Sequence, residues 1–219
     1  MKIALAALAA VGALACAPVA AADDSAADLR IGQAGTLVNG DVVQTWTVSG
    51  LRTSADVIPG DVMSQRDDIY PLMLRGLSVH ADGPRTLLHS DVHLGNWYVT
   101  GDGRMGLCDW ALVCRGHWSR DFAYALSTVL DVADRRAWER DLLRRYLDRM
   151  KEFAAVRVDF DEAWLHYRRQ TFAALLMWTP TLCHPPTMPD MQPEAMSLEM
   201  IRRITAAMSD LESFDSWLG

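Results

Sequence analysis

Residue types that mark several common protein classes are scarce in this chain of 219 residues. It contains two lysines and four cysteines, and its formal net charge is −7. The negative charge argues against nucleic acid as a partner. No Cys-x-x-Cys pair and no spaced set of cysteines and histidines indicates a zinc site. Half of the residues are hydrophobic and no repeat or low-complexity tract is present, so most of the chain is expected to be globular.

The chain also lacks a hydrophobic run that is long enough to make a stable membrane span. The apolar stretch over residues 3–15 is short and rich in alanine, and it follows Met1-Lys2. Ala20-Ala21-Ala22 comes next, before two acidic residues. A basic start, a short apolar region and small residues are typical of a secretory signal peptide, so residues 1–22 are expected to be a leader. We expect export if this leader is genuine, and a cytoplasmic protein if the N-terminus is a fusion artefact.

Cysteine content conflicts with export. Removal of the leader leaves Cys108, Cys114 and Cys183, which is an odd number. Secreted domains usually pair their cysteines, whereas cytoplasmic proteins keep them reduced. The remaining cysteines therefore favour a reduced protein.

Residues 23–60 are expected to contain β structure. Asn39-Gly40 is a favoured hairpin turn between two β-branched segments, and residues 42–51 continue an alternating pattern. The segment resembles the start of the small secreted immunoglobulin-like antigens of actinobacteria. Two strands cannot bury the core of a sandwich. We therefore expect residues 23–60 to pack poorly on the rest of the chain and to be cut first by proteases.

Residues 61–219 are expected to be helical apart from one hairpin. Thr179–Pro193 holds five of the nine prolines and is predicted to be a loop. In the last helix Met196, Met200, Ile204 and Met208 recur at helical spacing, and this stripe is interpreted as core packing. The predicted fold class is mainly α (α+β). The predicted helices span residues 61–81, 119–132, 134–153, 159–178 and 194–218.

The stretch His89-Ser90-Asp91-Val92-His93-Leu94-Gly95-Asn96 is the most informative about chemistry, and Asp109 follows it after thirteen residues. Phosphoryl transfer from ATP needs a carboxylate that orients the acceptor hydroxyl, and oxygen ligands for Mg²⁺. Asp91 suits the first role, and Asn96 and Asp109 suit the second. The alternative is a surface hairpin with incidental carboxylates.

The residues between Asn96 and Asp109 are predicted to form a β-hairpin. Residues 97–100 and 105–108 have the composition of short strands, and Asp102-Gly103 is favoured in a two-residue turn. That turn would place Asn96 opposite Asp109, close enough for both to share a cation. A shift of one residue would place Asn96 opposite Cys108 instead.

At these residues the chain resembles the aminoglycoside phosphotransferase-like kinases, a branch of the protein-kinase-like fold. Their catalytic loop reads His-Gly-Asp-x-x-x-x-Asn, and their metal loop is a hydrophobic residue followed by Asp-Trp, as in Leu107-Cys108-Asp109-Trp110. The similarity continues through Arg115–Leu126. It implies that residues 61–219 form the C-terminal lobe of that fold. The implied activity is the transfer of a phosphoryl group from ATP, with Mg²⁺, to a small-molecule hydroxyl.

Two further residues are expected to support this site. His89 opens the motif, and Asp121 lies near the start of the following helix, where it could cap that helix or hold the catalytic loop by hydrogen bonds. Ser90 departs from the family pattern, which has glycine there. It adds a side chain at a tight backbone position, so a lower rate is expected.

The lack of lysine limits the enzymatic interpretation. Kinases of this fold position the ATP phosphates with a lysine on a strand of the N-terminal lobe. Neither Lys2 nor Lys151 comes from that place, and Gly32-Gln33-Ala34-Gly35 is a weak match to a phosphate loop. We therefore expect a truncated, weakly active phosphotransferase, joined near Pro59-Gly60 to a secretion leader and antigen-like strands. The alternative is an exported, non-enzymatic protein with a vestigial kinase lobe.

Overall fold

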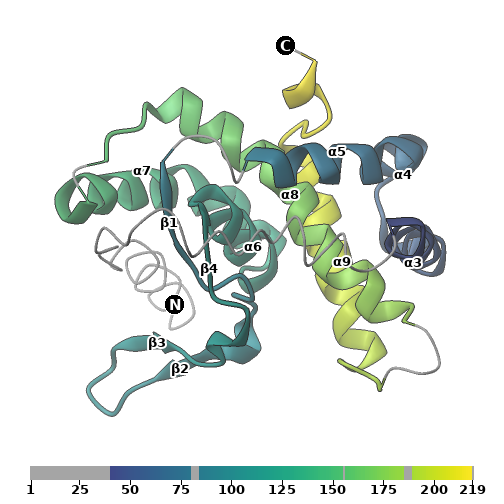
Figure 1. Cartoon of the computed structure of the whole chain (residues 1–219), viewed down its shortest axis with the longest axis horizontal. Coiled ribbons are helices and arrows are strands. Elements are labelled where there is room, and N and C mark those ends of the chain that lie inside the picture. The colour runs from purple at the N-terminus through teal and green to yellow at the C-terminus, as the bar shows by residue number, and fades with distance from the viewer. Residues whose placement is uncertain (1–39, 80–83, 155, 185–188, 219) are drawn as a thin grey trace. The chain divides into compact units, whose positions relative to one another are not determined.

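A computed structural model describes residues 40–79, 84–154, 156–184 and 189–218 (Figure 1). The expected leader and the first expected strand lie outside these residues. The described part is mainly helical with two small antiparallel sheets, which confirms the predicted fold class. None of the helices described here is long and apolar enough to cross a membrane.

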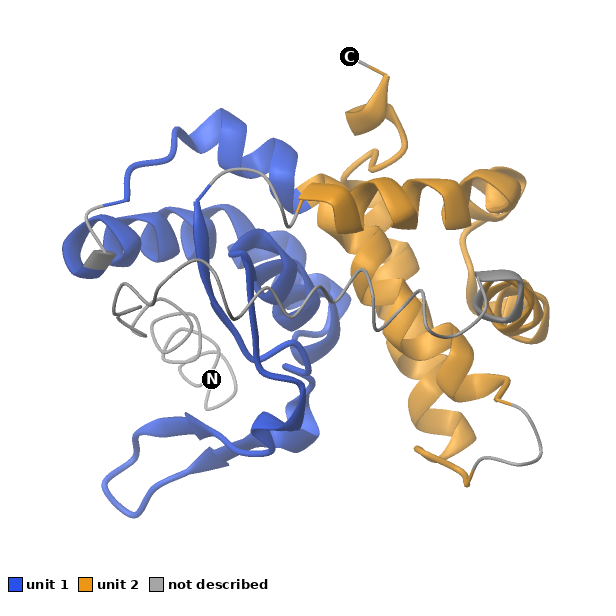
Figure 2. Cartoon of the chain, viewed as in Figure 1, with its two compact units in different colours: residues 1–29, 80–167 blue, residues 30–79, 168–219 orange. Residues whose placement is uncertain are grey.

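The chain divides into two compact units, which are best described one at a time (Figure 2). Among the described residues, unit 1 comprises 84–167, and unit 2 comprises 40–79 together with 168–218. Helix α8, Phe160–Leu182, contributes its first turns to unit 1 and its remainder to unit 2.

Unit 1 begins with two small sheets. Strand β1, Arg85–Leu88, pairs antiparallel with β4, Cys114–His117, so that Leu88 lies opposite Cys114. The second sheet is the hairpin of β2, Trp97–Val99, and β3, Met105–Leu107, which extends away from the helices of unit 1 (Figure 1). The 3-10 helices η3, Leu94–Asn96, and η4, Trp110–Leu112, flank this hairpin.

Helices α6, Ser119–Val129, and α7, Val132–Ala154, complete unit 1 with the start of α8. Aromatic rings fill its interior, and each is fully or almost fully buried. Arg135 and Glu139 form a buried ion pair at 2.6 Å, and the Glu139 carboxylate also accepts a hydrogen bond from the hydroxyl of Tyr167. Such a pair is retained at low cost only where further hydrogen bonds satisfy it. The packed rings are those of Trp118, Phe122, Tyr146 and Tyr167.

Unit 2 is entirely helical in its described part. It contains α3, Gly40–Thr53, the later part of α8 and α9, Glu194–Asp210. Met200, Ile204 and Met208 of α9 are buried as expected, but Met196 is exposed. The shorter helices of this unit are η1, Ala55–Val57, α4, Gly60–Ser64, α5, Arg66–Ser78, and η5, Asp215–Trp217.

The strand predicted over residues 42–51 is wrong, because this segment forms α3. Thr47, Leu51 and Ser54 are buried at helical spacing. Gly50 lies on the same side and contacts the backbone of Thr179 so closely that a Cβ atom would collide with it. This contact, made between segments far apart in the sequence, outweighs the local β propensity of valine and threonine.

The expected poor packing of the segment before residue 61 is also wrong for its described part. Leu51 and Ile58 belong to the buried core, and Ser54 is buried and bonded to the carbonyl of Gly50. The immunoglobulin-like resemblance therefore has no support in the structure of residues 40–60. Residues 44–60 are an integral part of unit 2.

The helix boundaries differ modestly from the predictions. The single helix expected over 61–81 is divided into α4 and α5 at Gln65. Helix α8 continues through Pro180 to Leu182, although the proline removes one backbone hydrogen bond from its last turn. The last helix ends at Asp210, and Arg168 of α8 donates hydrogen bonds to the carbonyls of Leu211 and Glu212 just beyond it.

Candidate active site

The loop of residues 89–96 lies directly after β1 in unit 1. It turns into η3, which is stabilised at its start because the ring nitrogen Nδ1 of His93 accepts the backbone N–H of Gly95 at 3.1 Å. The backbone N–H of Asn96 then donates to the carbonyl of His93 at 3.0 Å. This compact turn brings Asn96 back toward Asp91.

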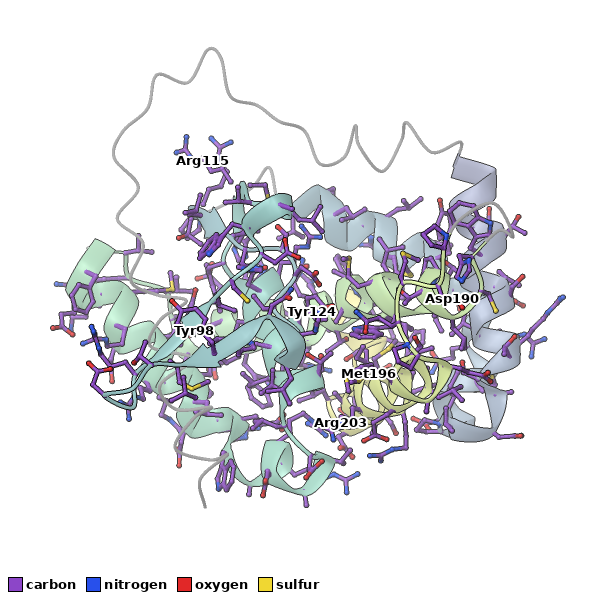
Figure 3. All side chains as sticks on the ribbon, turned by 90° about the horizontal axis from the view of Figure 1, so that it is seen from below. Tyr98, Arg115, Tyr124, Asp190, Met196 and Arg203 are labelled. Atoms are coloured by element: carbon purple, nitrogen blue, oxygen red, sulfur yellow. The ribbon has the colours of Figure 1, made fainter. Side chains whose placement is uncertain are left out.

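The carboxylate of Asp91 is held at both oxygens. Oδ1 accepts a hydrogen bond from the hydroxyl of Tyr124 at 3.1 Å, and Oδ2 accepts one from Nδ2 of Asn96 at 3.2 Å. Nε2 of His93 lies 3.6 Å from Oδ2. The side chain of Asp91 is nevertheless 25% exposed, so it is oriented by its neighbours and still open to a reactant. Figure 3 labels Tyr124, which reaches this site from α6.

His89 connects the 89–96 loop with the loop of residues 107–110. Its Nε2 atom lies 2.8 Å from the carbonyl oxygen of Cys108, and its Nδ1 atom accepts the backbone N–H of Asp91 at 3.3 Å. Because Nδ1 accepts a hydrogen bond and Nε2 faces a carbonyl oxygen, these contacts place the ring proton on Nε2. The ring also packs against Trp110, with centroids 4.6 Å apart.

Asp121 anchors the start of the 89–96 loop from the first turn of α6. Its carboxylate accepts the backbone N–H of His89 at 2.6 Å and that of Ser90 at 3.2 Å. Of the two roles expected for Asp121, the structure shows hydrogen bonds to the loop. Burial raises the pKa of the Asp121 carboxyl above its ordinary value, and the positive charge of Arg120 and the two N–H groups oppose that rise.

Ser90 adopts a backbone conformation that suits glycine. Its φ is +70°, in the left-handed region, which explains the tight backbone position expected there. Its buried hydroxyl lies 3.0 Å from the sulfur of Cys114 and accepts a long hydrogen bond of 3.4 Å from Arg120. The side chain therefore has defined partners, although the backbone would be less strained with glycine.

The hairpin has the alternative register. Trp97 pairs with Leu107, and the backbone N–H of Cys108 donates to the carbonyl of Asn96 at 2.9 Å, so Asn96 lies opposite Cys108. The predicted two-residue turn is wrong because Thr100 pairs with Arg104 around a three-residue turn. Gly103 takes the left-handed conformation that this turn requires, with a φ of +82°.

The carboxylate of Asp102 stabilises that longer turn. It accepts hydrogen bonds from the hydroxyl of Thr100 and, at 2.8 Å, from Nε of Arg104. These bonds to both flanking residues lower the pKa of the Asp102 carboxyl.

Asp109 follows the hairpin in a strained conformation. Its φ is 60° and its ψ is 68°, which is left-handed and uncommon for a residue with a side chain. Its side chain is exposed and forms no hydrogen bond or ion pair with the other residues described. Strain of this kind often marks functional loops, where the surrounding structure maintains it.

The donor set of Asn96 and Asp109 suits Mg²⁺. The amide nitrogen of Asn96 is occupied by Asp91, and its Oδ1 oxygen has no hydrogen-bond donor among the described residues. Within the described ranges there is no group of three or more histidine, cysteine and acidic side chains that could bind a metal. Mg²⁺ is usually bound through one or two carboxylates together with water and substrate phosphates, and that pattern needs few protein ligands.

Sequence reasoning missed the partners of Asp91. Tyr124 lies one helical turn after Asp121, so both side chains project from one side of α6 toward the 89–96 loop. That spacing was a usable signal for Tyr124. The proximity of His93 to Asp91, and of Arg120 to Ser90, depends on the tight loop and on packing, which no spacing in the sequence reveals.

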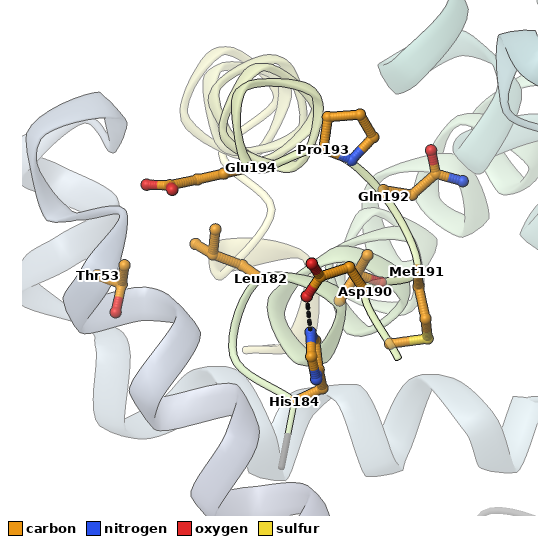
Figure 4. A pocket seen from close by; sticks show the side chains of 9 residues that line it. Thr53, Leu182, His184, Asp190, Met191, Gln192, Pro193 and Glu194 are labelled. Carbon is orange, nitrogen blue, oxygen red and sulfur yellow. Dashed lines mark hydrogen bonds and ion pairs between the residues drawn. The ribbon is translucent and has the colours of Figure 1, made fainter. Parts of the chain in front are cut away.

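A separate cavity of about 600 Å³ lies in unit 2 (Figure 4). Nε2 of His184 lies within hydrogen-bond distance of Asp190 there, at 3.1 Å, and Glu194 lines the same space.

Comparisons with known proteins place the motifs in context. The phosphotransferase enzyme family matches residues 61–178, which is more than half of the chain. A domain of unknown function (DUF1942) matches residues 27–71. The search of curated proteins gives no match.

Among solved structures, an ethanolamine kinase from Plasmodium vivax is similar at 10% sequence identity and a TM-score of 0.41. The similarity covers 98% of this chain and 49% of the kinase, so the chain spans about half the length of that protein. The family match includes the 89–96 loop, Asp109 and Asp121, whose contacts are described above. The chain therefore belongs to the phosphotransferase enzyme family.

Proposed function

We propose that this protein transfers the γ-phosphoryl group of ATP to the hydroxyl of a small molecule, at a low rate. The strongest support is the environment of the Asp91 carboxylate. Its two oxygens accept hydrogen bonds from Tyr124 and Asn96, while the side chain stays partly exposed. A carboxylate held in this way can accept a hydrogen bond from an acceptor hydroxyl and orient its oxygen for in-line attack.

Asn96 and Asp109 are proposed as the protein ligands of Mg²⁺. When bound, the ion would neutralise the negative charge that the ATP phosphates carry. The oxygen of Asn96 and the unpaired carboxylate of Asp109 are the donors that Mg²⁺ prefers. His89 is proposed to fix the distance between the two loops that carry these ligands, because its ring is bonded to both.

The low rate follows from the missing lysine. In this fold a lysine positions the ATP phosphates, and the chain has no candidate at the expected place. Phosphoryl transfer depends mainly on positioning and charge neutralisation, so the loss of one positioning group lowers the rate without removing the acceptor side of the reaction.

Single-turnover phosphoryl transfer tests the proposal. The purified chain is incubated with radiolabelled ATP, Mg²⁺ and a panel of small alcohols, and labelled product is separated from free phosphate. We expect slow transfer that Asp91→Ala removes, because a positioned base typically contributes about 10²–10⁴-fold. Asp148→Asn is the matched control, since it removes an exposed carboxylate of α7 outside the site.

Three results would contradict different parts of this proposal. Equal activity of the wild type and Asp91→Ala would show that Asp91 has no role in the reaction. Rates near those of ordinary kinases, on the order of 1–100 per second, would show that another residue replaces the lysine. Release of labelled free phosphate without any labelled alcohol would assign the activity to ATP hydrolysis.

A further inference from the structure

Trp217 of unit 2 is in contact with two positively charged groups. The guanidinium carbons of Arg75, on α5, and Arg169, on α8, each lie 4.7 Å from the centre of its ring. Cation–π contacts stabilise each arrangement, yet two like charges on one ring repel each other. Arg75 is exposed and Arg169 is half-buried, so solvent screens part of this repulsion and both charges stay accessible to an anion.

No carboxylate in the described part of the chain forms an ion pair with Arg75 or Arg169. Arg169 donates to the carbonyl of Ser216 at 2.9 Å, and its neighbour Arg168 donates to the carbonyl of Leu211 at 2.6 Å. The guanidinium of Arg75 has the indole ring as its only partner among the described residues. Burial lowers the pKa of Arg169, and the positive charges of Arg75 and Arg168 lower it further.

The indole N–H of Trp217 is a second unsatisfied group in the same place. The side chain is 9% exposed, and Nε1 has no acceptor among the residues that the structure describes. A buried donor without a partner destabilises the folded state. A buried N–H without an acceptor is uncommon in folded proteins, and a bound ligand that supplies the acceptor would explain it.

A cavity of about 310 Å³ adjoins these groups. Leu72, Phe214 and Trp217 give it an apolar lining, and Arg75 and Asp68 are its charged residues. Small-molecule sites are typically about 300–1,000 Å³, mostly apolar, with a few polar groups that fix orientation. All of these residues belong to unit 2, whereas the proposed phosphotransfer residues belong to unit 1.

We propose that this cavity binds a small organic anion, with its apolar body against Leu72, Phe214 and Trp217 and its acid group on Arg75. A carboxylate or phosphate ester would meet the planar, multiply donating guanidinium that suits such groups. A cation would be repelled by Arg75, which lines the cavity, and by Arg169 on the same indole ring. A neutral apolar compound would leave their charge uncompensated.

The probe for this site is 1-naphthoate, which combines an aromatic body with a carboxylate. Its neutral counterpart, 1-naphthalenemethanol, has a similar shape without the charge. Binding is followed in full-length protein by the indole N–H resonances, and the resonance of Trp217 is assigned with Trp217→Phe. We expect 1-naphthoate to shift this resonance and to bind at least about tenfold more tightly than the alcohol, as a charge-assisted hydrogen bond of about 1.4 kcal/mol implies.

Three variants separate the contributions to binding. Arg75→Gln should weaken 1-naphthoate about tenfold, and Arg75→Lys, which keeps the charge but not the planar group, should weaken it less. Asp68→Asn should tighten binding, because it removes the carboxylate that lines the same cavity. Arg115→Gln is the matched control, since Arg115 is an exposed arginine of unit 1 that projects from β4 (Figure 3).

Equal affinity for the acid and the alcohol would overturn the proposal, as would an unmoved Trp217 resonance. An unchanged affinity in Arg75→Gln would have the same meaning, provided that thermal unfolding shows the variant to be folded. If Arg75→Gln fails to fold, Asp68→Asn decides the question. Tighter binding of 1-naphthoate, with unchanged binding of the alcohol, supports the site, and unchanged binding of 1-naphthoate overturns it.

Discussion

The Nε2 atom of His89 lies 2.8 Å from the carbonyl oxygen of Cys108, the residue immediately before Asp109. Through its other nitrogen the same ring accepts the backbone N–H of Asp91. One buried imidazole thus connects the carboxylate proposed to orient the acceptor with the carboxylate proposed to bind Mg²⁺. The connection does not depend on the side chains of Asp91 and Asp109, because both bonds are made to the backbone.

His89→Ala should destabilise the protein by about 2–3 kcal/mol. The substitution removes a fully buried ring that packs on Trp110, and it leaves a carbonyl and an N–H without their partner. Urea unfolding measures the effect. His184→Ala, which alters a histidine at the edge of the unit 2 cavity, is the comparison and should cost less. A change below about 0.5 kcal/mol in His89→Ala would mean that the ring does not connect the two loops energetically.

Two substitutions at Ser90 isolate the strain of the 89–96 loop. Ser90→Ala and Ser90→Gly both remove the hydroxyl that contacts Cys114, but only alanine keeps a Cβ atom at a φ of +70°. We expect the glycine variant to be more stable than the alanine variant by about 1 kcal/mol, because a left-handed conformation costs a residue with a Cβ atom about 1–2 kcal/mol. Equal unfolding free energies in the two variants would show that the loop can relax.

Helix α3 shows why the local sequence pattern gave a wrong prediction of β structure before residue 60. Asn39-Gly40 and the valines after it favour a hairpin when only neighbours are considered. The face that is buried consists of Thr47, Gly50, Leu51 and Ser54, whose spacing is helical but whose composition is largely polar or glycine. A search for apolar residues alone cannot detect such a face. The close approach of Gly50 to α8 gives this glycine its structural reason.

The candidate site was more predictable than that helix. The motif residues His89, Asp91, Asn96 and Asp121 are brought together by contacts that their sequence pattern implied. The hairpin register depended on whether the turn has two or three residues, and the bonds of Asp102 to both flanking residues favour the longer turn. The sequence alone therefore located the loops but left their register open.

Acid should weaken α9 through Glu199. Its carboxylate binds Arg202 and Arg203 at 2.7 and 2.6 Å, and these bonds lower its pKa to about 2 from an ordinary value of 4.5. Because the pKa is lower in the folded state, the contribution is present above pH 4.5 and is lost as the pH falls toward about 2. The side chain is 35% exposed, so solvent screening limits the loss to about 1 kcal/mol.

Comparison with Glu199→Gln checks this pH dependence. The free energy of unfolding is measured for both proteins between pH 6 and pH 2. The difference between them should be largest near pH 6 and should shrink through the stated window. A difference that stays constant with pH would contradict the assigned pKa.

Binding of Mn²⁺ with ATP, followed by electron paramagnetic resonance, tests the central claim most directly. Mn²⁺ replaces Mg²⁺ at oxygen ligands and reports its own binding. The account predicts that the wild type binds the ion together with ATP, and that Asp109→Asn weakens this binding about tenfold or more. Asp102→Asn, which changes a carboxylate at the other end of the same hairpin, should leave it unchanged. Unchanged binding in Asp109→Asn, or equal losses in both variants, would contradict a metal site at the 107–110 loop.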